Sequence, residues 1–184
     1  MRNVKGLKVF LSAGHRGPGT GARGYFDEGL EALWLRDRLY ALLEGYGVVV
    51  LRDRDDASLS EVVGMVNGSL CKEDICVDIH FNAFDGSASG VEVLVPSVCT
   101  DVEVGLGAGL AGLTSRVLGI RNRGVRSEGS GRHSRLAMLS DVRCESVVWE
   151  VCFCDNALDA SRYASHKLLL AERVAGCLRE FAGV

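Results

Sequence analysis

Apolar residues recur along the chain with two different periods, and segments of the two kinds alternate. Short apolar runs typical of buried strands occupy 7–12, 48–53, 74–80, 90–96 and 145–153. Longer segments with apolar residues at helical spacing occupy 28–47, 58–70, 102–119 and 157–182, the last as one or two helices. This alternation of strands and helices predicts an α/β fold.

Local signals and the absence of linkers refine this prediction. Ser58 followed by Glu61 forms a capping-box pattern at the start of 58–70. The helix over 102–119 is the weakest, because five glycines lower its helix propensity. No linker or repeat divides the chain, so we expect one domain over 1–184. Its twisted central sheet should have about six strands, largely parallel, with helices on both faces, since such apolar strands need cover on both sides.

The composition is that of a globular protein without a marked charge preference. Hydrophobic residues make up 47% and charged residues 24% of the 184 residues. The formal net charge of -3 does not favour nucleic acid or an anionic membrane as a partner. One stretch is locally basic and contains Arg121, Arg123, Arg126, Arg132 and Arg135. This cluster either binds an anionic group or belongs to a solvated loop.

The cysteines and the N-terminus both indicate synthesis in a cytoplasm. Seven cysteines, an odd number, favour reduced and mostly buried thiols in a chain without a secretion signal. The first apolar run has five residues, which is shorter than the roughly 7–15 residues of a secretory signal. No segment approaches the ~18 apolar residues of a membrane span.

Polar residues stand where the predicted strands end. His15 follows the first strand, His80 ends 74–80, and Glu150 lies late in 145–153. Ligands of open α/β sheets bind beyond the carboxyl ends of the strands, so these side chains are candidates for one site. Glu28 opens the first long helix after a glycine-rich loop. The backbone freedom of that loop allows Glu28 to return to His15.

Two histidines and a carboxylate are a common ligand set for catalytic zinc, which keeps a fourth position for water. The metal lowers the pKa of that water to about 7. Glu150, in an apolar strand, would then suit the role of a general base. The chain has no HExxH signature, so scattered structural polar residues remain the alternative interpretation.

Three stretches carry a family resemblance: "VFLSAGHRGPGTGARGYFDE", "ICVDIHFNAF" and "SVVWEVCFCDN". With them the sequence resembles the zinc-dependent N-acetylmuramoyl-L-alanine amidases of the amidase-3 family, nearly from end to end. The "FCDN" ending and the compact length look most like the catalytic domains of clostridial phage endolysins.

The resemblance implies roles for particular residues. One Zn²⁺ ion would be bound by His15, Glu28 and His80, with Glu150 as the catalytic glutamate and Asn82 as a substrate-binding residue. The implied reaction is hydrolysis of the amide between N-acetylmuramic acid and the L-alanine of the peptidoglycan stem peptide. The implied setting is a phage endolysin or a bacterial autolysin.

The sequence also departs from the family pattern. Asp27 and Glu31 compete with Glu28 for the third ligand position, although helical spacing favours Glu28. Asp78 stands where many members of the family carry a serine. It lies two residues before His80 on the same strand face, and we expect it to orient His80 only if the chain bends.

Two other functions stay open beside the amidase. One is a different zinc-dependent peptidase or deacetylase of the same fold, and the other is a catalytically silent wall-binding module. The intact set of four residues argues against the silent module. We expect a monomer without a separate cell-wall-binding domain, which reaches the wall after holin-type release or cell lysis. His133 is expected in an exposed loop or near the substrate.

Overall fold

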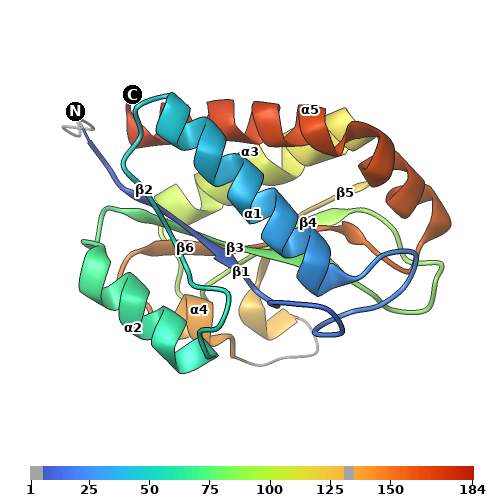
Figure 1. The fold of residues 1–184 in the computed structure, drawn as a ribbon, viewed down its shortest axis with the longest axis horizontal. Helices are drawn as coiled ribbons and strands as arrows, with labels where there is room; N and C mark the ends of the chain where they lie inside the picture. The colour runs from blue at the N-terminus through green and yellow to red at the C-terminus, as the bar shows by residue number, and fades with distance from the viewer. Residues whose placement is uncertain (1–5, 131–134) are drawn as a thin grey trace.

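The computed structural model of the protein describes residues 6–130 and 135–184, which contain a six-stranded sheet (Figure 1). The strand order is β2-β1-β3-β6-β4-β5. The strands are β1 (Val9–Ala13), β2 (Val50–Arg52), β3 (Ile75–Asn82), β4 (Val91–Val95), β5 (Asn122–Ser127) and β6 (Glu145–Phe153). The five predicted strands are therefore confirmed, with small differences at their ends.

Most of the sheet is parallel, as predicted. The strands β2, β1, β3 and β6 run in one direction and bring their carboxyl ends to one edge. In contrast, β4 runs antiparallel to β6, and β5 is parallel to β4. The connection from β3 to β4 spans only 83–90, whereas a parallel crossover needs a dozen or more residues. The chain therefore turns back, and a reversed pair of strands forms one side of the sheet.

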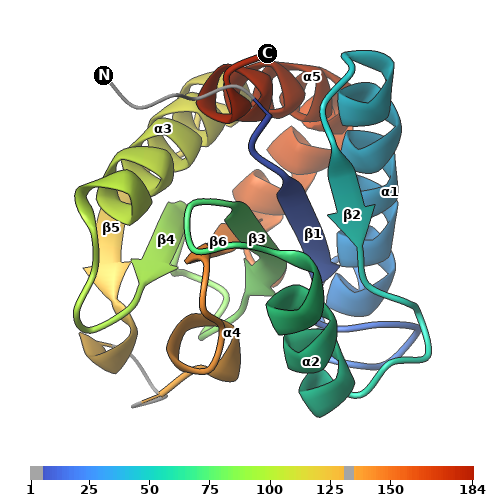
Figure 2. The ribbon, with the colours of Figure 1, turned by 90° about the vertical axis from the view of Figure 1, so that its left-hand side faces the viewer.

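Helices cover both faces of the sheet, which confirms the expected layers (Figure 2). The helices are α1 (Glu28–Gly45), α2 (Leu59–Ser69), α3 (Asp101–Leu118), α4 (Ala137–Ser140) and α5 (Ala157–Ala182). A short 3-10 helix, η1, spans Glu128–Ser130. Figure 2 shows α1, α3 and α5 on one face and α2 and α4 on the other. The capping box predicted at Ser58 is present at the start of α2.

The helix α3 forms in spite of its glycines. Thr100 and Glu103 make a capping box that satisfies backbone groups of its first turn. Gly107 faces the sheet, where an added Cβ would lie 3.1 Å from Val125 and 3.2 Å from Val93. The glycine that lowers helix propensity thus permits close packing of α3 on β4 and β5.

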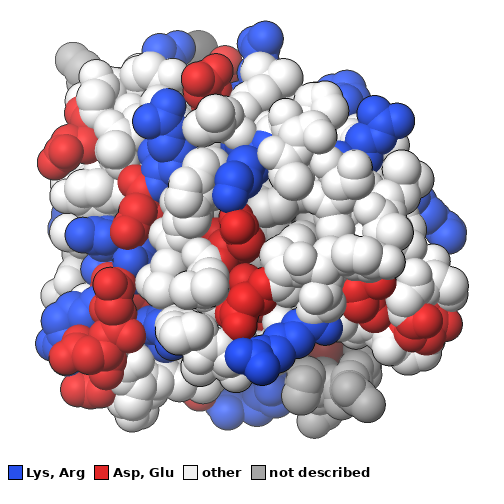
Figure 3. Space-filling model, turned by 45° about the vertical axis from the view of Figure 1, so that its right-hand side comes forward, with Lys and Arg blue, Asp and Glu red and all other residues white. Residues whose placement is uncertain are grey.

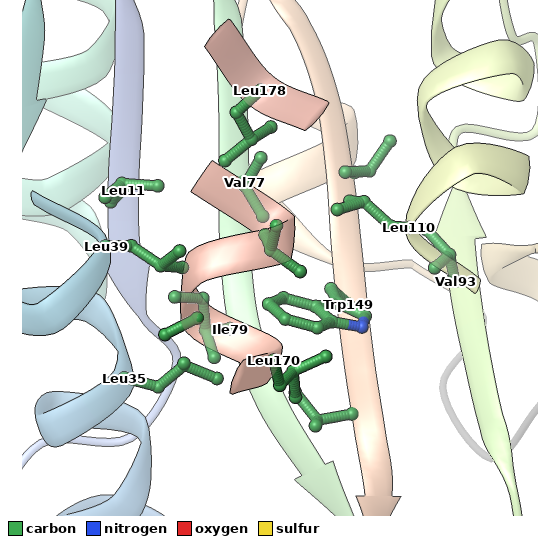
Figure 4. Packing of buried hydrophobic residues seen from close by; sticks show 14 of the residues in the cluster. Leu11, Leu35, Leu39, Val77, Ile79, Val93, Leu110, Trp149, Leu170 and Leu178 are labelled. Atoms are coloured by element: carbon green, nitrogen blue, oxygen red, sulfur yellow. The ribbon is translucent and has the colours of Figure 1, made fainter. Parts of the chain in front are cut away.

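The main core lies between the sheet and the layer of α1, α3 and α5. Figure 4 shows Leu39, Ile79, Trp149 and Leu170 among the side chains that fill it, each fully or almost fully buried. A buried ion pair lies beside this core: Nη1 of Arg36, in α1, is 2.7 Å from the carboxylate of Asp53. This pair ties α1 to the segment that follows β2.

The edge strand β5 (Asn122–Ser127) was not among the predicted strands. Its side chains are half-buried or exposed, so it lacks the apolar run that identified the others. Arg123 and Arg126 of the basic cluster lie in this strand and form ion pairs, so the solvated-loop interpretation is wrong for them. Arg132 and His133 lie outside the described residues.

Two features of the surface bear on possible partners. Among residues 6–130 and 135–184, no helix has the length and apolar character needed to cross a membrane. On the face shown in Figure 3, acidic and basic side chains lie intermixed. That distribution agrees with the small net charge of -3.

Candidate metal centre and adjacent carboxylates

The first strand delivers His15 to the carboxyl edge of the sheet. Gly14 follows β1, and a Cβ added to it would lie 1.8 Å from Nε2 of His80. The backbone after β1 therefore passes directly against the imidazole of the neighbouring strand. On the other side of His15, Arg16 donates a hydrogen bond to the buried carboxylate of Asp53 at 2.7 Å. This bond fixes the chain immediately after His15.

The loop between β1 and α1 returns Glu28 to His15. Gly21 has a φ of +75°, and a Cβ there would lie 2.3 Å from Oε2 of Glu28, so the turn requires glycine. The Glu28 carboxylate accepts hydrogen bonds from the backbone N–H groups of Ala22 at 2.6 Å and Phe81 at 3.0 Å. Glu28 is only 2% exposed, and these two bonds orient it.

The structure brings His15, Glu28 and His80 together from three separate segments of the chain. One ligand atom from each lies within 4.8 Å of the other two. Nδ1 of His80 is 3.0 Å from Oε1 of Glu28, and Nε2 of His15 is 3.9 Å from Oε2 of Glu28. The two imidazoles meet edge to face, with ring centroids 5.2 Å apart. The side chains of all three residues predicted as ligands thus converge on one point.

Glu150 lies beside this cluster on the adjacent strand. In the sheet register it pairs with His80 of β3 on one side and with Glu92 of β4 on the other. Directly paired residues point to the same face, so the three side chains form a row across three strands. Oε2 of Glu150 is buried and has no hydrogen-bond partner within the described residues. Burial raises the pKa of Glu150 to about 7; His80 opposes this shift, and Glu28 and Glu92 add to it.

The chemistry of this donor set fits a divalent metal ion. Burial lowers the pKa of His15, which favours the neutral imidazole that binds metals. An unpaired carboxylate oxygen such as that of Glu150 is costly to bury without a nearby positive charge. Two imidazoles and one carboxylate, with a further carboxylate beside them, match the ligands of catalytic zinc sites.

The two carboxylates that competed with Glu28 have other partners. Asp27 is the N-cap of α1, and its side chain also accepts a hydrogen bond from Gly19 N at 2.8 Å. Glu31 lies further along α1 and forms an ion pair with Lys167 of α5 at 2.8 Å. Both interactions hold these carboxylates in structural contacts, which favours Glu28 as the third ligand.

Asn82 belongs to a polar network next to Glu150. Its Nδ2 donates a hydrogen bond to Oε1 of Glu92 at 3.0 Å. Oε2 of Glu92 accepts hydrogen bonds from Arg123 at 2.7 Å and from Arg126 at 3.2 Å. The structure thus gives Asn82 a site-shaping contact, and a contact with substrate stays a prediction.

Glu92 was not identified as a site residue from the sequence, although its position in an apolar strand was a signal. It stands in the apolar run "GVEVLV", where a buried charge needs partners. Its partners, Arg123 and Arg126, come from the edge strand that the sequence did not predict. Without that strand, nothing in the sequence connected Glu92 with the site.

The raised pKa of Glu150 predicts a pH-dependent stability in the metal-free protein. Because the folded state holds this proton more tightly than the unfolded chain, stability falls as pH rises from the ordinary carboxyl pKa towards about 7. Glutamine does not titrate, so Glu150→Gln lacks this loss. The free energy of unfolding of the metal-free variant, relative to that of the wild type, should therefore rise by on the order of 2 kcal/mol from pH 5 to pH 8. Urea unfolding with a chelator present measures the gain, and equal pH dependence in both proteins would contradict it.

Comparison with known families supplies an independent line of evidence. The profile of the Amidase_3 family, described as N-acetylmuramoyl-L-alanine amidase, matches residues 9–180. No curated protein matches the chain in sequence. The family match spans every strand and all four residues predicted for the metal site and its base.

Solved structures with the same fold cover nearly the whole chain. The catalytic domain of the CD27L endolysin targeting Clostridia difficile is 23% identical, covers 96% of both chains and has a TM-score of 0.74. An N-acetylmuramoyl-L-alanine amidase from Clostridium difficile 630 is 20% identical, covers 97% of this chain and 98% of that chain, and has a TM-score of 0.82. A putative amidase from Neisseria meningitidis is 24% identical over 96% of both chains, with a TM-score of 0.81.

Proposed function

The chain belongs to the Amidase_3 family of N-acetylmuramoyl-L-alanine amidases, and from this premise we propose that it hydrolyses peptidoglycan with one zinc ion. The proposed bond is the amide between N-acetylmuramic acid and the L-alanine of the stem peptide. The proposed ligands are His15, Glu28 and His80, with Glu150 as the catalytic residue and Asn82 as a substrate contact.

The convergence of the three ligands carries this proposal. Donor atoms that lie 13 to 65 residues apart along the chain come within 4.8 Å of one another at the carboxyl edge of the sheet. Glu150 occupies the adjacent register position with one buried, unpartnered oxygen. A structural role alone gives no reason to place four ionisable side chains together there.

A zinc ion at this position would supply a Lewis acid that polarises the scissile carbonyl and lowers the pKa of a water molecule to about 7. Glu150 accepts the proton of the attacking water and returns it to the nitrogen of the leaving L-alanine. Its raised pKa in the metal-free site suits a group that must both take and release a proton near neutral pH.

The remaining residues hold this machinery in place. The backbone N–H groups of Ala22 and Phe81 orient Glu28, so that its carboxylate faces both imidazoles. Glu92, which pairs with Glu150 in the sheet register, restrains the side chain of Asn82, the proposed substrate contact. Such fixed supports reduce the reorganisation needed when substrate binds.

The products of digestion test the proposal. Purified peptidoglycan from several bacteria, clostridia included, is incubated with the zinc-loaded protein, and new amino groups and new reducing sugar ends are measured. We expect new amino termini on L-alanine and no new reducing ends, because the glycan strands stay intact. Amino groups from other stem residues, acetate release or new reducing ends would assign a different reaction.

The setting of this activity is part of the same proposal. We place the substrate in the cell wall, reached after holin-type release or cell lysis, and we expect a monomer. Clearing of wall suspensions by protein added from outside, together with the mass of the protein in solution, examines both expectations. A stable dimer, or activity only on isolated muropeptides, would revise them.

A further inference from the structure

Asp78 contacts the side of the His80 imidazole that faces away from Glu28. Oδ2 of Asp78 lies 3.1 Å from Nε2 of His80, while Nδ1 of the same ring lies 3.0 Å from Oε1 of Glu28. Asp78 and His80 are two positions apart on β3, so both side chains point to one face of the sheet. Regular pairing with β6 is interrupted just beyond His80. The contact between Asp78 and His80, which was expected from the sequence only if the strand bends, is therefore present.

The burial of Asp78 argues against a purely structural role. Asp78 is 3% exposed, in the middle of β3, between Ser12 of β1 and Val148 of β6. Its Oδ1 has no hydrogen-bond partner within the described residues, and its Oδ2 is bonded only to His80 there. A carboxylate buried with so few partners costs stability. Its contribution must therefore come through the imidazole.

We propose that Asp78 is a positioning residue, which accepts the Nε2–H of His80 and so leaves Nδ1 available to bind the metal ion. The proposal rests on the metal site of the proposed function and adds a residue to it. A ligating histidine whose second N–H is bound by a carboxylate has a fixed tautomer and ring orientation and is a more basic ligand. The serine that many related amidases carry here would offer the imidazole only a neutral hydroxyl oxygen as acceptor.

Zinc affinity measured by competition with a chromophoric chelator tests this role. For Asp78→Ala we expect a loss of about 10–100-fold in affinity for zinc, the range found for such outer partners. Asp78→Asn and Asp78→Ser keep an uncharged acceptor and should fall between alanine and the wild type. Without metal, each variant loses the buried carboxylate contact of Asp78 with His80, so its melting temperature is measured beside its zinc affinity. A variant that stays folded and still binds zinc more weakly assigns the loss to the metal site.

The tautomer of His80 gives a second readout, which a merely structural role would not move. Long-range ¹H–¹⁵N spectra of the zinc-loaded wild type should show His80 protonated at Nε2 and bound to metal through Nδ1. In Asp78→Ala the Nε2–H signal should shift and exchange faster with water. The opposite tautomer in the wild type would overturn the proposal even if the alanine variant fails to fold.

Asp74→Asn is the matched control, because Asp74 is a buried aspartate just before the same strand. It accepts hydrogen bonds from Lys8 N and Cys71 N, far from the metal site in the sheet register. Its variant should lose stability and keep wild-type zinc affinity. Equal zinc affinity in Asp78→Ala and the wild type would sink the Asp78 role alone, whereas a wild type that does not bind zinc would sink the proposed function as well.

Discussion

Replacing Glu150 by glutamine should lower the rate of amide hydrolysis by about 10²–10⁴-fold, the range for loss of a general acid–base group. Glutamine keeps the size of the side chain and removes the ability to take up a proton. The loss should appear in kcat, because the residue acts on the transferred proton and not on zinc or on remote parts of the substrate. Release of L-alanine amino groups at saturating peptidoglycan fragment measures it.

The matched control is Glu145→Gln, which makes the same change on the same strand. Glu145 is also buried but lies at the opposite end of β6, next to Thr100. This variant should keep its activity, and both variants should retain one zinc ion per chain. A Glu150→Gln enzyme that clears walls as fast as the wild type would remove Glu150 from the mechanism.

Removal of zinc should abolish hydrolysis and also lower the melting temperature. An ion that binds only the folded state at 100 times its Kd contributes about 2.7 kcal/mol, which corresponds to about 5–10 °C for a chain of this size. Dialysis against a chelator followed by calorimetry and an activity assay measures both effects. Added zinc should restore both, because the ligands stay in place in the folded chain.

Histidine variants show whether the effect belongs to the proposed site. His80→Ala should lose zinc, activity and the stabilisation by added zinc together. His166→Ala should lose none of them, because His166 lies in α5 and its Nδ1 contacts the carbonyl of Arg162. Zinc that stabilises His80→Ala as strongly as the wild type would place the metal at another set of residues.

Much of the fold was predictable because its buried strands are short and strongly apolar. Runs such as "VVVL" before Arg52 and "SVVWEV" around Glu150 have little alternative to a covered parallel sheet. Because strand ends in such a sheet share one edge, the grouping of His15, His80 and Glu150 followed from the strand assignment. Their roles as ligands and base stay predictions until metal and activity are measured.

Features that depend on tertiary contacts were beyond the reach of periodicity. The edge strand β5 has no apolar run, so its arginines looked like part of a loop. The reversed direction of β4 follows from the short connection 83–90, but residue patterns do not show that its antiparallel partner is β6. The role of Glu92 depends on Arg123, which it contacts only in the folded chain, whereas the contact of Asp78 with His80 was already expected on the condition of a bend.

Backbone pairing between β3 and β6 sets the spacing of His80 and Glu150. Inserting or deleting one residue within β6 would turn Glu150 to the opposite face, away from the other three groups. A change of length in a connection between strands leaves the pairing of β3 with β6 intact and is therefore easier to accommodate. The number of residues in these two strands is therefore fixed by the geometry of the site as well as by the packing of the sheet.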